Sequence, residues 1–166
     1  MKRFLLILTI GWMCFIFYQG SRQLSDSYHN SDVVVNKVVS FIETIYEKVN
    51  PDSSQEMIIT SQRRAKLAYL IRKSAHFFEY GALAALLIIV FYLLKQSSLN
   101  RVVYSLFITL LCAVMDEFYQ SFINRGSRVQ DIIIDFSGAL VGTIFVVMGM
   151  KIFTTIKIKK ERGSVS

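Results

Sequence analysis

Apolar residues occur in four long blocks along the chain, and these blocks predict α-helices that span a membrane. The blocks lie at residues 2–19, 77–94, 102–122 and 131–153. A transmembrane helix needs about 20 mostly apolar residues to cross the hydrocarbon core of a bilayer, and each block approaches or reaches that length. The pattern therefore predicts an all-α integral membrane protein with four transmembrane helices.

The first block follows Lys2 and Arg3, as the apolar region of a signal peptide would. The residues after it, YQGSR at 18–22, contain no A-x-A-like cleavage site. We therefore interpret residues 2–19 as an uncleaved signal anchor.

The region from 20 to 75 is the one long polar stretch, and it predicts helical structure outside the spans. Within residues 32–49 apolar side chains recur at helical spacing, with Ser31 or Asp32 as a candidate cap and Pro51 beyond the end. The apolar positions are Val34, Val38, Phe41, Ile42, Ile45 and Val49. This pattern favours an extracytoplasmic amphipathic helix between spans one and two, lying on the membrane surface or packed on the spans. A second helical stretch, from about Glu56, leads into span two.

Composition supports a membrane protein and excludes a nucleic-acid-binding one. Of 166 residues 53% are hydrophobic, and the net charge is +7. The basic residues flank apolar blocks, where they meet lipid headgroups, and form no stripe with aromatic platforms. Cys14 and Cys112 lie inside apolar blocks and predict no disulfide. The length fits a single domain, 1–166, with a basic tail at 154–166.

The positive residues also predict the orientation in a bacterial plasma membrane. With four spans, basic residues at both termini and in the turn at 95–101 share one side, which is then cytoplasmic. The basic residues between 63 and 73 lie on the other side, in a loop of a length at which the rule weakens. Both termini are thus expected in the cytoplasm.

Ionisable residues gather where spans two and four begin and span three ends, so they share the face that this orientation places outside the cell. Such residues are costly within a membrane and point to a site. The candidate set is Arg72, Lys73, His76, Glu79, Tyr80, Asp116, Glu117, Gln120, Arg125, Arg128, Asp131 and Asp135. Five carboxylates nearly balance four fixed cations and one histidine, which suits a paired network or a headgroup pocket. Gly138 and Gly142 continue the face of Asp131 and Asp135; helix packing is the favoured interpretation of them, and an oligomer is permitted.

Three strings in order resemble the VanZ-like family of bacterial membrane proteins. They are RKSAHFFEYGAL (72–83), DEFYQSFINRGSRVQD (116–131) and DIIIDFSGALVG (131–142), and the segment SRQLSDS (21–27) also fits. The chain departs from the family at Tyr119, where members often have histidine, a potential metal ligand or proton carrier. The resemblance implies a cell-envelope protein, and VanZ itself is associated with low-level resistance to teicoplanin, a lipoglycopeptide.

Three interpretations of the cluster stay open. The first is binding or remodelling of a lipid or lipid-linked precursor headgroup, with Arg125 and Arg128 on phosphate and the carboxylates holding them. The second is a membrane enzyme acting on a phospholipid or isoprenoid-phosphate lipid. Its candidate catalytic residues are His76, Glu79, Asp116 and Glu117, in a cluster that also contains Asp135. His76 would act as general base, with Glu79 or Asp116 as its orienting carboxylate. The third is a structural ion-pair plug. No cofactor is evident; a divalent metal has no specific motif behind it. Expected partners are membrane lipids, a lipoglycopeptide or lipid-linked cell-wall precursor, and a second copy of the chain.

Overall fold

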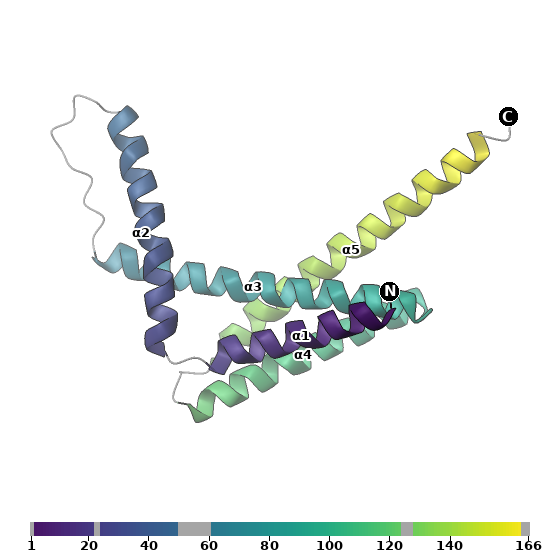
Figure 1. Cartoon of the computed structure of the whole chain (residues 1–166), viewed down its shortest axis with the longest axis horizontal. Helices are drawn as coiled ribbons and strands as arrows, with labels where there is room; N and C mark the ends of the chain where they lie inside the picture. The colour runs from purple at the N-terminus through teal and green to yellow at the C-terminus, as the bar shows by residue number, and fades with distance from the viewer. Residues whose placement is uncertain (1, 22–23, 50–60, 124–127, 164–166) are drawn as a thin grey trace. The chain divides into compact units, whose positions relative to one another are not determined.

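The computed structural model describes residues 2–21, 24–49, 61–123 and 128–163. Over these residues the chain forms five α-helices and no strand (Figure 1). The helices are α1 (Lys2–Ser21), α2 (Leu24–Val49), α3 (Ser61–Leu93), α4 (Ser98–Phe122) and α5 (Val129–Gly163). Four of them, α1, α3, α4 and the Val129–Lys157 part of α5, are long and apolar enough to cross a membrane. The predicted all-α fold with four membrane-spanning helices and an additional helix between the first two is confirmed.

The chain divides into two compact units, which are described separately. The larger unit comprises Met1–Ser21 and His76–Ser166, and the smaller comprises Arg22–Ala75. The larger unit therefore holds α1, most of α3, α4 and α5.

The core of the larger unit lies where α1, α3 and α4 meet. Its fully or nearly buried members are Ile16, Tyr80, Leu83, Leu87, Cys112 and Ala113. Trp12 packs against this core, and its indole Nε1–H donates a hydrogen bond of 3.0 Å to the Glu79 carbonyl oxygen. An indole N–H that is shielded from water needs such a partner, so this bond fixes α1 against α3.

Helices α3 and α5 approach so closely that their backbones touch, and glycines make this possible. A Cβ atom on Gly138 would overlap the carbonyl oxygen of Phe77, and one on Gly142 would overlap that of Gly81. The GxxxG spacing on α5 therefore serves packing against α3 of the same chain. The glycine face of α5, which the sequence would also allow to contact a second copy of the chain, packs against α3 in the larger unit.

The turn between α3 and α4 is short because Lys95 adopts a left-handed conformation, with a φ of 62°. That conformation ends α3 and lets the Gln96 N–H donate to the Phe91 carbonyl oxygen at 3.1 Å. Ser97 then caps α4, since its side chain accepts a hydrogen bond of 3.2 Å from the Asn100 N–H.

In the smaller unit, α2 packs against the N-terminal part of α3 through a small apolar contact. Val35 and Val39 are 2% exposed and pack with Ala68, Leu67 and Ile71. Arg64 adds a hydrogen bond of 3.0 Å from Nη1 to Asn36 Oδ1. The amphipathic helix is therefore present, but it begins at Leu24 and runs through both candidate caps, Ser31 and Asp32, so those two caps were wrongly predicted.

The apolar side chains of α2 that the sequence singled out are mostly exposed. We define the α2 stripe as Val34, Phe41, Ile42, Ile45 and Val49, all exposed. The valines that are buried, Val35 and Val39, lie on an adjacent face of the same helix. The smaller unit thus uses one apolar face of α2 internally and leaves a second one uncovered.

Candidate functional site

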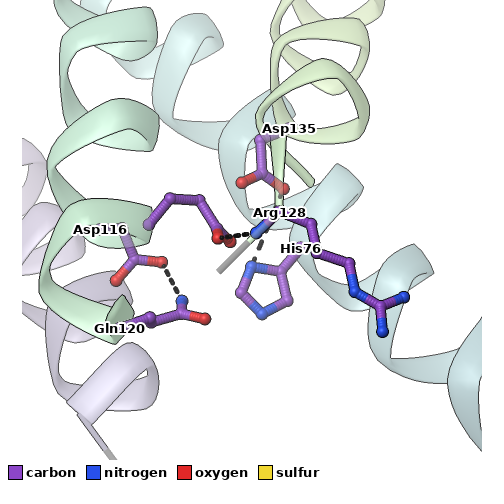
Figure 2. Close-up of polar contacts among 6 residues, drawn as sticks. His76, Asp116, Gln120, Arg128 and Asp135 are labelled. Atoms are coloured by element: carbon purple, nitrogen blue, oxygen red, sulfur yellow. Dashed lines mark hydrogen bonds and ion pairs between the residues drawn. The ribbon is translucent and has the colours of Figure 1, made fainter. Parts of the chain in front are cut away.

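Three helices of the larger unit bring the predicted polar residues together. The last turns of α4 supply Asp116, Glu117 and Gln120, and the first turns of α5 supply Asp131 and Asp135. All five are buried, with Asp116 at 0% and Asp135 at 1% exposure. His76 and Tyr80 of α3 complete the group, which we call the polar cluster. Figure 2 labels His76, Asp116, Gln120 and Asp135 of this cluster. The order of the spans predicted that these residues share one end of the helices, and the structure brings them together there.

Asp116 is held on α4 and covered by α1. Its Oδ2 accepts a hydrogen bond of 2.8 Å from Gln120 Nε2, one helical turn further on. Gly20, at the end of α1, lies directly against the carboxylate, and a Cβ there would collide with it. Gly20 was not among the predicted site residues, because its only signal in the sequence is a glycine next to the polar end of the first span.

His76 lies beside Asp135, a different carboxylate from the ones the sequence suggested. The distance from His76 Nδ1 to Asp135 Oδ1 is 3.8 Å, an ion-pair separation that is too long for a hydrogen bond. The imidazole stacks on the Tyr80 ring, with centroids 6.5 Å apart and planes 16° from parallel. His76 therefore sits between an aromatic ring of its own helix and an acidic side chain of α5.

Tyr80 is the most enclosed large side chain of the cluster, at 0% exposure. Its phenol lies within electrostatic range of Asp116, Glu117 and Asp135. Its hydroxyl has no hydrogen-bond partner among the residues that the structure describes. A buried hydroxyl of this kind is costly without a partner, so it marks a place where a polar group would be accommodated favourably.

Glu117 and Arg128 are connected through the main chain. The Arg128 backbone N–H donates a hydrogen bond of 3.0 Å to Glu117 Oε2, across the connection between α4 and α5. The Arg128 side chain is exposed, and Figure 2 shows its guanidinium directed away from Asp116 and Asp135. The carboxylate thus fixes the position of the residue while the guanidinium stays accessible.

The remaining candidates are Arg72, Lys73, Glu79 and Arg125. Arg125 lies outside the described residues. Arg72 and Lys73 belong to the smaller unit, where Lys73 Nζ lies 5.6 Å from the centroid of the Tyr69 ring. Glu79 is half-buried near the cluster on α3, and its carbonyl oxygen is the acceptor for Trp12. Tyr119, the position that departs from the family pattern, is exposed on α4.

The described side chains do not form a metal centre. Within the described ranges no group of three or more His, Cys, Asp or Glu side chains could hold a metal ion. A protein site for a hard divalent cation gathers several oxygen ligands within about 2.6 Å of one point.

The fold and this cluster define a polytopic α-helical membrane protein with a buried acidic group at one end of its spans. A family model described as VanZ/LLP1 matches residues 5–153, which is most of the chain. The chain therefore belongs to the VanZ-like family, as its three motifs indicated. Comparison with curated proteins and with solved structures found no match.

Proposed function

We propose that this VanZ-like protein acts in the bacterial cell envelope by binding or remodelling the phosphorylated headgroup of a lipid or lipid-linked precursor. The polar cluster would be the site, on the extracytoplasmic face. The observation that carries the proposal is the pairing of Glu117 with the main chain of Arg128. It holds an exposed guanidinium at the end of the spans, and a guanidinium recognises phosphate through two parallel hydrogen bonds.

The buried acids would supply the second half of the recognition. Asp116, Asp131 and Asp135 are buried at the ends of two spans. Carboxylates accept hydrogen bonds, so they suit the hydroxyl or amine groups that accompany phosphate in lipid headgroups and glycolipid precursors. Binding of such a precursor is also how the protein would contribute to low-level resistance to teicoplanin, which carries a lipid chain of its own.

A second candidate is a membrane enzyme that acts on a phospholipid or an isoprenoid-phosphate lipid. The observation that favours it is the His76–Asp135 pair, because a buried carboxylate beside an imidazole is the usual arrangement of a general base and its orienting group. His76 is partly accessible, with 21% of its side chain exposed. In this candidate Asp135 takes the orienting role that Glu79 or Asp116 had in the sequence-based hypothesis.

The test compares Arg128→Gln with Lys159→Gln in a teicoplanin-sensitive Gram-positive host. Both variants remove one exposed positive charge, and Lys159 lies at the other end of α5. With membrane abundance matched, wild type and Lys159→Gln should lower susceptibility to teicoplanin but not to vancomycin, and Arg128→Gln should not. Equal protection by both variants would remove Arg128 from the site.

A direct binding measurement separates the two candidates. Purified protein would be titrated with a polyprenyl phosphate and followed by native mass spectrometry and by phosphate release. Headgroup binding predicts about tenfold weaker binding for Arg128→Gln and no release of phosphate. The enzyme predicts phosphate release that His76→Ala abolishes while binding persists. If every cluster variant binds as wild type does and none of the proteins turns the lipid over, the cluster is an ion-pair plug.

A further inference from the structure

A cavity lies at the opposite end of the spans from the polar cluster. It has a volume of about 460 Å³ and is lined by the end of α3, the start of α4 and residues 147–155 of α5. Figure 1 shows α5 diverging from α4 towards its carboxyl end. The lining residues are Ile88, Tyr92, Ser98, Arg101, Val102, Val147, Met150, Lys151, Thr154 and Thr155.

One end of this cavity is built for an anion. It carries two cations, Arg101 and Lys151, with hydroxyl groups nearby, and none of the lining residues among those that the structure describes is acidic. Arg101 is held in place, since its Nη2 donates to Ser98 Oγ at 2.7 Å and its guanidinium lies 5.1 Å from the centroid of the Tyr92 ring. A guanidinium oriented by a hydroxyl and an aromatic ring keeps its other N–H groups available for a phosphate.

The rest of the cavity is apolar. Ile88, Val102 and Val147 form its walls together with Met150. These walls come from three helices that are apolar enough to cross a membrane, so we expect the cavity to lie at the level of the bilayer. A molecule that enters it from the side of the protein comes from the membrane, which favours a lipid over a soluble ligand.

We propose that this cavity is a binding site for one anionic phospholipid. The phosphate lies between Arg101 and Lys151, and an acyl chain lies along Ile88, Val102 and Val147. The two cations without an acidic neighbour in the lining select an anionic lipid over a zwitterionic one. The positive residues predict that this end of the spans lies in the cytoplasmic leaflet, which is where basic pockets between helices meet anionic headgroups.

A smaller cavity supports the same assignment of this end. It has a volume of about 200 Å³ and is lined by Lys2, Arg3, Leu6, Val90, Leu93 and Leu94. This cavity lies between the start of α1 and the end of α3, and like the larger one it combines two cations with apolar walls. Its lining lacks the hydroxyl groups of the larger cavity, so the larger one is the better phosphate site.

The site is independent of the proposed function, because it shares no residue with the polar cluster. The experiment is native mass spectrometry of the full chain in detergent, titrated with phosphatidylglycerol or with phosphatidylcholine. Wild type should bind phosphatidylglycerol about tenfold more tightly, because the choline of phosphatidylcholine would bring a third positive charge next to Arg101 and Lys151. The double variant Arg101→Gln with Lys151→Gln should lose that preference.

Two further variants make the result decisive. Lys95→Gln with Lys159→Gln removes the same charge from exposed positions outside the cavity and should bind as wild type does. Val147→Trp keeps every charge but fills the apolar wall, and it should weaken binding of phosphatidylglycerol about tenfold. Thermal unfolding without lipid checks that each variant is folded. The proposal is wrong if phosphatidylcholine binds as tightly as phosphatidylglycerol, or if Val147→Trp binds as wild type does.

Discussion

Gly20 of α1 lies directly against the carboxylate of Asp116 in α4, so the end of the first helix is shaped to fit an acidic side chain. A Cβ at position 20 would occupy the place of that carboxylate. Asp116 is fully buried and bonded to Gln120, and it has little room to move aside. This contact ties the N-terminal helix to the polar cluster.

We expect Gly20→Ala to destabilise the protein because of this contact. Forcing extra volume into a packed interior costs about 1–3 kcal/mol. The effect should appear as a lower midpoint of thermal unfolding in detergent. Gly11→Ala is the matched control, since a Cβ at Gly11 meets nothing within 4 Å. In the variant Gly20→Ala with Asp116→Ala the space is restored, so the two effects should be less than additive.

Gly142→Ala is expected to be more damaging, because the group it meets is backbone. A Cβ there would overlap the Gly81 carbonyl oxygen, and neither helix has a flexible side chain that can yield. The helices α3 and α5 would have to separate, so membrane abundance should fall several-fold. Gly149→Ala, on the same helix with nothing within 4 Å, should keep wild-type abundance. Normal abundance of Gly142→Ala would contradict the close packing of these helices.

Hydropathy predicted the helices well because it reports a property of each segment alone. The four blocks fall within α1, α3, α4 and α5, and the charged ends of three of them do meet. Which side chains touch depends on the rotation of each helix about its axis, and the sequence does not determine that. His76 therefore lies against Asp135 of another helix, although Glu79 is one turn away on its own.

The contribution of α1 to the site could not be predicted for the same reason. Gly20 and Trp12 act through contacts with distant segments, and neither carries a charge or belongs to a motif. On α2, spacing predicted a helix with an apolar face, but it could not decide which of two adjacent apolar faces is used. Val35 and Val39 are buried there, while Phe41 and Val49 are exposed.

Glu117→Ala should destabilise the protein, whereas Arg128→Gln should not. The alanine variant removes the acceptor of the Arg128 backbone N–H, a bond to a charged group of the kind worth about 1.5–3 kcal/mol. Arg128→Gln keeps that N–H and changes an exposed side chain, so its effect should stay within about 0.5 kcal/mol. Thermal unfolding of the two purified variants decides this. A large loss in Arg128→Gln would show that its side chain has a structural role.

His76 and Asp135 should behave as a coupled pair in a double-mutant cycle. The variants are His76→Gln, Asp135→Asn and their combination, measured by thermal unfolding. Residues in direct contact typically couple by about 0.5–3 kcal/mol. Phe78→Leu, at an exposed position of α3, provides a control that should be additive with Asp135→Asn. Strict additivity of the first pair would mean that the 3.8 Å separation carries no interaction.

The orientation of the chain leads to a labelling prediction. Gln96 and Gln130 are both exposed, and α4 separates them. In a background of Cys14→Ser and Cys112→Ala, a membrane-impermeant maleimide should label Gln130→Cys in intact cells. It should label Gln96→Cys only after permeabilisation. The reverse pattern would place the polar cluster on the cytoplasmic side and exclude an extracytoplasmic headgroup as its ligand.

The α2 stripe should lie in the membrane interface, because an exposed apolar face of an amphipathic helix gains free energy by entering the headgroup region. A spin label at Phe41→Cys should then be accessible to oxygen, which partitions into lipid, and protected from a water-soluble nickel complex. Ser40→Cys lies on another face of α2 and is exposed, so it should show the opposite accessibility. Both measurements use the full chain in anionic vesicles and the same cysteine-free background. If the two labels show the same accessibility to oxygen and to the nickel complex, α2 does not lie in the bilayer interface. Its apolar stripe would then be covered by something other than lipid.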